Sequence, residues 1–105
     1  MKHFVYIIHS SKVGSYYKGY SIRPFHRLRE HNENSSRYTA NKGPWKLVYL
    51  QSFPDKKEAL IRERKLKKYS KDQILRLVRT PLNEIAKFKR DSPSKIVIIL
   101  KLKIV

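Results

Sequence analysis

Two short runs of strand-forming residues near the N-terminus constrain the fold of this chain more than any other feature. Residues 4–8 (FVYII) are apolar on both side-chain faces, which is typical of a strand covered on both sides. Residues 10–15 (SSKVGS) supply turn chemistry, with Gly14 free to take a positive φ. The aromatic run at residues 16–20 (YYKGY) reads as a second strand, so the sequence predicts an antiparallel hairpin.

This hairpin brings two tyrosines together. Tyr6 lies in the first run and Tyr17 in the second. Because side chains alternate between the faces of a strand, the two become cross-strand neighbours if the turn centres near Ser11 and Lys12. We therefore expect two phenols side by side on one face of a sheet.

Helix and strand signals follow the hairpin in a simple order. Pro24 suits the first turn of a helix that reaches about Asn32, and residues 45–53 (WKLVYLQSF) have the alternation of a third strand. Asp55 and Glu58 have the spacing of a capping box, which starts a second helix.

The C-terminal third carries weaker signals. Ser70 and Gln73 repeat the capping-box spacing, and Thr80–Pro81 predicts a further short helix through Phe88. Residues 95–105 form either an edge strand or a tail that folds with a partner, because periodicity alone does not decide between them. The predicted fold is α+β: a small three-stranded antiparallel sheet flanked by helices in the order ββαβαα, with an extra C-terminal helix and strand. We expect a functional domain at residues 1–79 and an extension at residues 80–105.

The charge of the chain requires an anionic partner. Its 25 Lys and Arg against 8 Asp and Glu give a net charge of +17. Nucleic acid and anionic membrane surfaces are the two ordinary candidates, and the interleaving of aromatic with basic residues favours nucleic acid. The chain has no cysteine, and neither terminal apolar run reaches the length of about 20 residues that a membrane helix needs. We therefore expect a cytoplasmic protein that does not enter a membrane.

One carboxylate falls on a helix face that should be apolar. Ala59, Leu60 and Leu66 define the inward stripe of the second helix, and Glu63 lies four residues from Ala59 and three from Leu66. An ionised and unpaired carboxylate there would cost several kcal/mol, so Glu63 needs a basic side chain or a cation as its partner. On the residues alone, a partly buried salt bridge, or a position at the edge of the stripe where Glu63 reaches water, is favoured over a functional role.

The first helix carries a second pair of interest. Arg27 and His31 are four residues apart and share one face, displaced by part of a turn from the apolar side of Leu28. Both side chains can point along the sheet toward the hairpin. The alternative is a solvated basic face that Arg27 shares with Arg23.

Taken together, these residues resemble the GIY-YIG endonuclease superfamily, and most closely its small single-domain bacterial members. Phe4-Val5-Tyr6 stands at the first triplet of the family and Tyr17-Lys18-Gly19 at the second. Residues 27–32 (RLREHN) resemble the Arg and His segment of its first helix. Residues 37–68 resemble its loop, third strand and Glu-bearing helix, with Glu63 at the position of the metal ligand. The likeness covers about residues 2–70.

The resemblance implies a metal-dependent endonuclease that hydrolyses DNA phosphodiester bonds, with RNA as a further partner class, and that is structure-specific and linked to DNA repair or recombination. Glu63 would hold Mg²⁺ or Mn²⁺, and Arg27 would brace the phosphate. Tyr6 would be the general base with Tyr17 as its companion, or the reverse, with the phenol pKa lowered by positive charge from Arg27, the metal and His31. The implied catalytic residues are Tyr6, Tyr17, Arg27, His31 and Glu63, and the nucleic-acid contacts are Lys18, Gly19, Arg23, Arg37 and Lys42.

The sequence departs from the family pattern at three positions. Phe4 and Val5 replace Gly and Ile in the first triplet, and Lys18 replaces Ile in the second. We expect Phe4 to matter little if the strand begins there, and Lys18 to face away from the tyrosines. Two other functions are open: a non-catalytic nucleic-acid-binding module on the same scaffold, and a basic ribosome-associated or membrane-surface protein.

Overall fold

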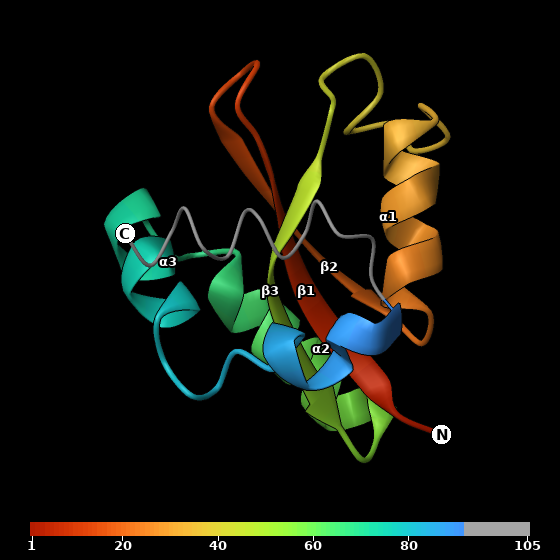
Figure 1. Cartoon of the computed structure of the whole chain (residues 1–105). Helices are drawn as coiled ribbons and strands as arrows, with labels where there is room; N and C mark the ends of the chain where they lie inside the picture. Colours follow the sequence, from red (N-terminus) through yellow and green to blue (C-terminus); the bar gives the residue numbers. More distant parts are fainter. Residues whose placement is uncertain (92–105) are drawn as a thin grey trace.

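The computed structural model describes residues 1–91 and has an α+β fold with the predicted order of elements (Figure 1). The elements are β1 (His3–Ser10), β2 (Ser15–Ser21), α1 (Pro24–Asn32), β3 (Lys46–Phe53), α2 (Lys56–Leu66), α3 (Lys71–Val78) and the 3₁₀ helix η1 (Ile85–Asp91). The strand predicted at residues 95–105 lies outside the described residues. None of the helices within residues 1–91 is long and apolar enough to cross a membrane.

The three strands form one antiparallel sheet in the order β2-β1-β3, so β1 is the central strand. Alternate residues of β1 enter two separate cores. Val5 and Ile7 pack with side chains of α2 and α3, whereas Tyr6 and Ile8 pack with Leu28 of α1. The sheet is thus covered on both faces, as the apolar run of β1 predicted. Because Tyr6 lies on the α1 face, side chains of α1 pack directly beside it.

The hairpin register differs from the prediction by two residues. Tyr6 pairs with Gly19, and Tyr17 pairs with Ile8, because the turn lies at residues 11–14 instead of centring on Ser11 and Lys12. Gly14 makes this turn possible: it has φ +68°, and its amide donates to the carbonyl of Ser10 at 2.8 Å. The two tyrosines share a face but are diagonal rather than directly opposite neighbours.

Strand β3 contains an irregularity that simple alternation did not predict. Ile7 pairs with Tyr49 and Ile8 with Leu47, which leaves Val48 as an extra residue in β3. Val48 and Tyr49 consequently belong to the same core, on the side of α2 and α3. This is the geometry of a β-bulge.

The chain between α3 and η1 corrects the prediction of a helix beginning at Thr80–Pro81. The Thr80 hydroxyl instead donates to the carbonyl of Leu77, and the chain then runs along the free edge of β3. The Asn83 side chain accepts from the Leu50 amide and donates to the Val48 and Val78 carbonyls. The Glu84 amide donates to the Leu50 carbonyl at 2.6 Å.

These bonds carry the chain from the α3 face of the sheet to the α1 face, where η1 completes the second core. Ile85 is buried there, and the Phe88 ring meets Phe4 edge to face at 5.3 Å. The division at residue 79 stays a prediction, but residues 83–88 pack on the same sheet as the first 79.

The predicted starts of α2 and α3 are confirmed. Asp55 Oδ1 accepts from the Glu58 amide at 2.8 Å at the start of α2. At the start of α3, Ser70 and Gln73 form a reciprocal capping box. These caps fix the first turns of the two helices on the sheet face opposite Tyr6.

Candidate functional site

The site is centred on Tyr6, whose ring lies across the neighbouring edge strand. Its side chain is 1% exposed. Gly19 is the residue directly opposite, and a Cβ built on Gly19 would overlap the Tyr6 hydroxyl and the end of its ring. The glycine of the second triplet therefore provides the space into which the phenol extends. Gly19 is buried, so it has a packing role, and its contact with nucleic acid stays a prediction.

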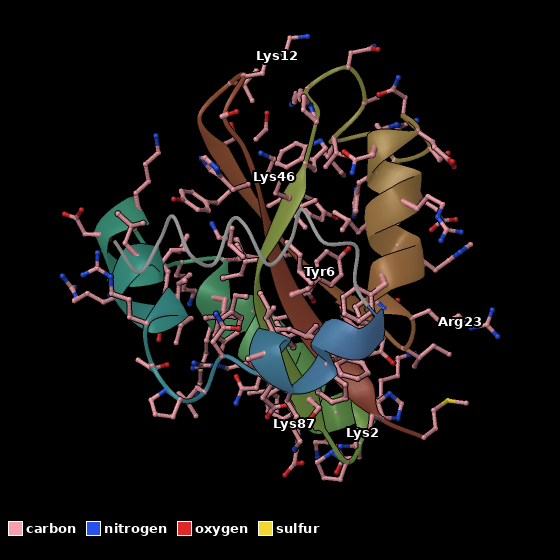
Figure 2. All side chains as sticks on the ribbon, viewed as in Figure 1. Lys2, Tyr6, Lys12, Arg23, Lys46 and Lys87 are labelled. Carbon is pink, nitrogen blue, oxygen red and sulfur yellow. The ribbon has the colours of Figure 1, made fainter. Side chains whose placement is uncertain are left out.

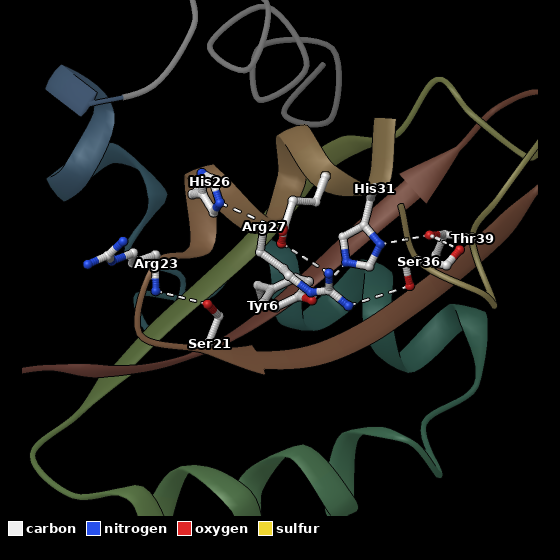
Figure 3. A network of polar contacts seen from close by, with 9 residues as sticks. Tyr6, Ser21, Arg23, His26, Arg27, His31, Ser36 and Thr39 are labelled. Atoms are coloured by element: carbon white, nitrogen blue, oxygen red, sulfur yellow. Dashed lines mark hydrogen bonds and ion pairs between the residues drawn. The ribbon is translucent and has the colours of Figure 1, made fainter. Parts of the chain in front are cut away.

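A buried chain of hydrogen bonds starts at the Tyr6 hydroxyl (Figure 3). Tyr6 Oη lies 2.9 Å from Nε2 of His31, and Nδ1 of the same ring lies 2.7 Å from the Thr39 hydroxyl. His31 and Thr39 are both 0% exposed. Helix α1 supplies the histidine and the loop after it supplies the threonine, so the chain ties β1, α1 and this loop together.

Tyr17 borders the same histidine. Its ring centroid is 5.0 Å from that of His31 and 6.5 Å from that of Tyr6. Unlike Tyr6, Tyr17 is half-buried. The structure thus gathers both tyrosines around His31, with Tyr17 as the more accessible phenol.

Arg27 is held beside Tyr6 by its own partners. Its Nη1 donates to Glu30 Oε1 at 3.1 Å, and its Nη2 lies 3.5 Å from the Ser36 hydroxyl. Figure 3 shows the guanidinium next to the Tyr6 hydroxyl. The Arg27 side chain is 31% exposed, so part of the guanidinium stays available to a ligand.

The side chains of the site do not by themselves lower the phenol pKa as the resemblance implies. Burial, followed by the nearby Tyr17, raises the pKa of Tyr6 well above its usual range, and Arg27 only partly opposes this. Burial, followed by the Arg27 charge, lowers the pKa of His31 to about 4, although Glu30 acts in the opposite direction. At neutral pH, Tyr6 therefore keeps its proton and His31 is uncharged, so His31 supplies no positive charge.

Glu63 points inward, as its position in the helix predicted. Its side chain is 17% exposed, between the buried Ala59 and Leu66, and its partner is Lys67 at a long 3.9 Å. The preceding residue, Arg62, reaches Gln51 of β3, so Glu63 lies on the other flank of the stripe, toward β2. Its carboxylate is close enough to Tyr6 to raise the phenol pKa further.

Glu63 fits a cation of the Mg²⁺ class as a single protein ligand. It is an oxygen donor, it is largely withdrawn from water, and its only ion pair within residues 1–91 is long. Among those residues there is no cluster of three or more His, Asp or Glu side chains that could form a metal cage. A metal held here would keep most of its coordination positions for water and phosphate oxygens.

The basic residues predicted to bind nucleic acid lie on different segments of the chain, and their contacts stay predictions. Arg23 precedes α1, and Arg37 and Lys42 lie in the loop after it; all three are exposed. Lys18 faces away from the tyrosines, as predicted, because it alternates with Tyr17 on β2. Figure 2 shows basic side chains such as Lys12 and Arg23 at the periphery, with Tyr6 in the interior.

Sequence reasoning missed three polar residues of this site. Glu30 could have been found, because it lies three residues after Arg27 on the same helix. Ser36 and Thr39 lie in an irregular loop, where no periodicity marks a buried residue, and both are buried.

The order of these residues matches a known domain. A sequence model of the GIY-YIG catalytic domain matches residues 2–75. The chain belongs to the GIY-YIG family. The match includes both triplets, Arg27, His31 and Glu63, and ends within α3, five residues beyond the predicted end at residue 70.

Relatives within the GIY-YIG family cover most of the chain. A UPF0213 protein of Staphylococcus saprophyticus is 38% identical over 78 residues, and one of Staphylococcus aureus is 40% identical over the same length. Each match spans 73% of this chain and 94% of the relative. The solution NMR structure of a UPF0213 protein from Bacillus halodurans is 35% identical and covers 74% of this chain and 83% of its own, with a TM-score of 0.47.

The structure accounts for a departure from the GIY-YIG pattern in the first triplet. Phe4 is the second residue of β1, close to the expected start of the strand, and it pairs with Ser21 and Ser52. It is 8% exposed and contacts Phe88 of η1. The large side chain of Phe4, at the family's glycine position, therefore packs against η1, which follows the residues that the family model matches.

The close packing of Gly19 and Tyr6 generates a stability prediction. Gly19→Ala places a methyl group where the phenol lies, and we expect it to lower the free energy of unfolding by about 1–3 kcal/mol. In a Tyr6→Leu background the same change should cost less, because leucine leaves the space at the end of the ring empty. Urea unfolding of the four proteins measures this coupling, and equal costs in the two backgrounds would contradict the packing role.

His31 generates a pH prediction. Its folded pKa of about 4 lies below its ordinary 6.5, so its contribution to stability is complete above pH 6.5 and is lost as the pH falls toward 4. The loss is on the order of 3 kcal/mol. Urea unfolding at several pH values should show that His31→Gln destabilises less at pH 4.5 than at pH 7. His26→Gln, which changes an exposed histidine on the same helix, should follow the wild type throughout. A pH-independent effect of His31→Gln would show that His31 titrates normally.

Proposed function

We propose that this chain is a metal-dependent endonuclease that hydrolyses DNA phosphodiester bonds, acting on DNA structures of the kind met in repair or recombination. The observation that carries the proposal is the buried bond between Tyr6 and neutral His31, beside an arginine that is partly open to ligands. A sheet face that served only stability would be filled with apolar side chains, because each buried polar group must be matched by a partner.

Arg27 is suited to hold the phosphate. Glu30 and Ser36 orient its guanidinium, so little side-chain freedom is lost when an anion binds. A guanidinium can brace two non-bridging oxygens by forked, charge-assisted bonds that a lysine cannot copy. The Arg27 guanidinium also lies beside the Tyr6 hydroxyl, so a scissile phosphate bound to it would lie next to the phenols.

The exposure of the two phenols supports one of the two tyrosine assignments that the sequence left open. An attacking water can reach half-buried Tyr17 more easily than Tyr6, which is 1% exposed and keeps its proton. We assign Tyr17 to accept a hydrogen bond from the water and orient it. Tyr6 then acts as the companion, with its hydroxyl held at His31 Nε2.

Binding of a phosphodiester changes the electrostatics of this pair. The depressed His31 pKa results from burial and from the Arg27 charge, and an anion on Arg27 offsets the second cause. His31 Nε2 then accepts a proton from the Tyr6 hydroxyl more readily, which leaves the tyrosine oxygen more basic. Thr39, on the other ring nitrogen, fixes the orientation of the imidazole during this step.

Glu63 is the residue that would hold the metal in this proposal. A bound Mg²⁺ or Mn²⁺ supplies stabilisation of the charge that develops on the leaving 3′ oxygen. The long bond to exposed Lys67 is easily given up, so the carboxylate is available at small cost.

One observation favours the second candidate, a non-catalytic nucleic-acid-binding module. Tyr6 is buried with a raised pKa, and as it stands it cannot act as a base near neutral pH. The charge of +17 suffices for phosphate binding without any metal. The two functions differ in whether bound DNA is cut.

Cleavage assays on branched, nicked and plain duplexes, with and without Mg²⁺, test the proposal. We expect Glu63→Gln and Arg27→Lys to lower the cleavage rate by about a hundredfold or more. The first removes the charge that would hold the metal, and the second removes the forked contact to the reacting phosphate. The matched controls Glu58→Gln and Arg29→Lys change exposed residues on the same two helices and should cut within about twofold of wild type.

Thermal melting of each variant shows whether the fold is intact. Wild-type protein that binds these DNAs but cuts none of them with Mg²⁺ or Mn²⁺ would favour the binding module. Cleavage that both site variants retain would show that the site assignment is wrong.

A further inference from the structure

A cavity lies on the sheet face opposite Tyr6, between the start of β2 and the start of α3. It has a volume of about 280 Å³ and is lined by residues 13–15 of the hairpin together with Tyr16, Lys18, Tyr69, Lys71 and Ile74. This volume is close to the lower limit of small-ligand sites, roughly 300 Å³. The alternation of β2 separates this cavity from the tyrosine site, because Lys18 and Tyr17 point to opposite faces.

Lys18 is the feature of this cavity that packing does not explain. It is half-buried, and within residues 1–91 it forms no salt bridge. Burial lowers its pKa, which shows that the ammonium has lost water without gaining an anionic neighbour among the described residues. Lys71 adds a second cation, and no Asp or Glu within residues 1–91 lines the cavity.

The remaining walls are aromatic and apolar. Tyr16 and Tyr69 are half-buried and pack at the margin of the core below, and Ile74 forms the floor. Residues 62–71 (RERKLKKYSK) end at this cavity, and Arg64, Lys65, Lys67 and Lys68 are exposed along them. Two lysines beside half-buried tyrosines, next to a wider run of exposed basic residues, are the composition of sites that bind single-stranded nucleic acid.

We propose that this cavity, the Lys18–Lys71 groove, binds one nucleotide of a nucleic-acid strand, with its phosphate between the two lysines and its base against Tyr69. A strand of DNA or RNA fits better than a free nucleotide, because the exposed lysines beside the groove extend the positive surface beyond a single phosphate. The proposal rests on the proposed function only in taking nucleic acid as the partner.

The position of the groove gives it a role beside the tyrosine site. Strand β2 is the edge of the sheet, and its successive residues Tyr17 and Lys18 face the site and the groove in turn. A strand that leaves Arg27 can pass over this edge and enter the groove. The groove would then hold an unpaired segment next to the phosphate at Arg27, which favours substrates that contain single-stranded DNA.

The experiment measures binding of a fluorescein-labelled single-stranded oligonucleotide of mixed sequence by fluorescence anisotropy, in EDTA so that no cleavage occurs. We expect Lys18→Gln/Lys71→Gln to weaken binding at least tenfold and to reduce the salt slope of log K by about 1.4, or 0.7 for each lost phosphate contact. The control Lys2→Gln/Lys87→Gln removes the same charge at the end of the molecule opposite the hairpin tip (Figure 2) and should leave that slope within about 0.5 of wild type.

Tyr69 tests the base contact separately. Tyr69→Leu should weaken binding about tenfold with an unchanged salt slope, and Tyr69→Phe should retain wild-type affinity, because phenylalanine keeps the stacking ring. Thermal melting confirms that each variant is folded.

The outcomes separate the groove from the proposed function. If the groove variants bind like the Lys2/Lys87 control while wild type binds tightly, the groove is overturned and the nuclease proposal is untouched. If deoxythymidine monophosphate shifts the NMR signals of Lys18 and Lys71 as strongly as the oligonucleotide does, the ligand is a free nucleotide and the strand proposal is overturned. If wild type binds no nucleic acid at low salt, both proposals fail.

Discussion

The hydrogen bond between the Tyr6 hydroxyl and His31 is the interaction on which the organisation of the site depends. It joins the central strand to α1 inside a core where neither group can turn to water for a partner. Gly19 permits it by leaving room for the phenol, and Thr39 completes it at the other ring nitrogen. In this chain the glycine of the second triplet is required because the phenol of the first triplet occupies the space of a side chain there.

The burial of this bond favours stability but limits the reactivity of the two groups. Burial keeps Tyr6 protonated and His31 neutral. This uncharged pair is stable without a ligand, but its phenol cannot act as a base near neutral pH. In the proposed function, negative charge near Arg27 would shift that balance, so the state of the phenol would depend on whether a phosphate is present. A buried polar pair of this kind gives up some stability for a response to ligand.

The sequence predicted those parts of the fold that follow from local periodicity and capping. The hairpin, the start of α1 at Pro24 and the caps at Asp55 and Ser70 all depend on neighbouring residues, and the structure has them where expected. Glu63 could be placed inward because helical spacing fixes its face. The hairpin register was wrong by two residues because the length of the turn decides it, and residue types at the turn allow more than one length.

The parts that could not be predicted depend on contacts between distant segments. The burial of Thr39 follows from where its loop meets α1, and the bulge at Val48 and the path of residues 80–84 depend on one another through Asn83. The contribution of burial to the pKa of Tyr6 was not foreseen, because the number of neighbouring cations is visible in the sequence, whereas the depth of burial is not.

The path of residues 83–84 along β3 has a consequence for how this protein can be studied in isolation. On the outer side of β3, Asn83 and Glu84 form hydrogen bonds with the amides of Leu50 and Ser52 and with the carbonyl of Leu50. A fragment cut at residue 75, where the match to the family ends, would leave these groups open on a sheet margin of eight residues. Open strand margins recruit strands from other molecules. The shortest fragment of this protein without an open strand edge therefore extends past the family boundary and includes Phe88, which also closes the core over Phe4.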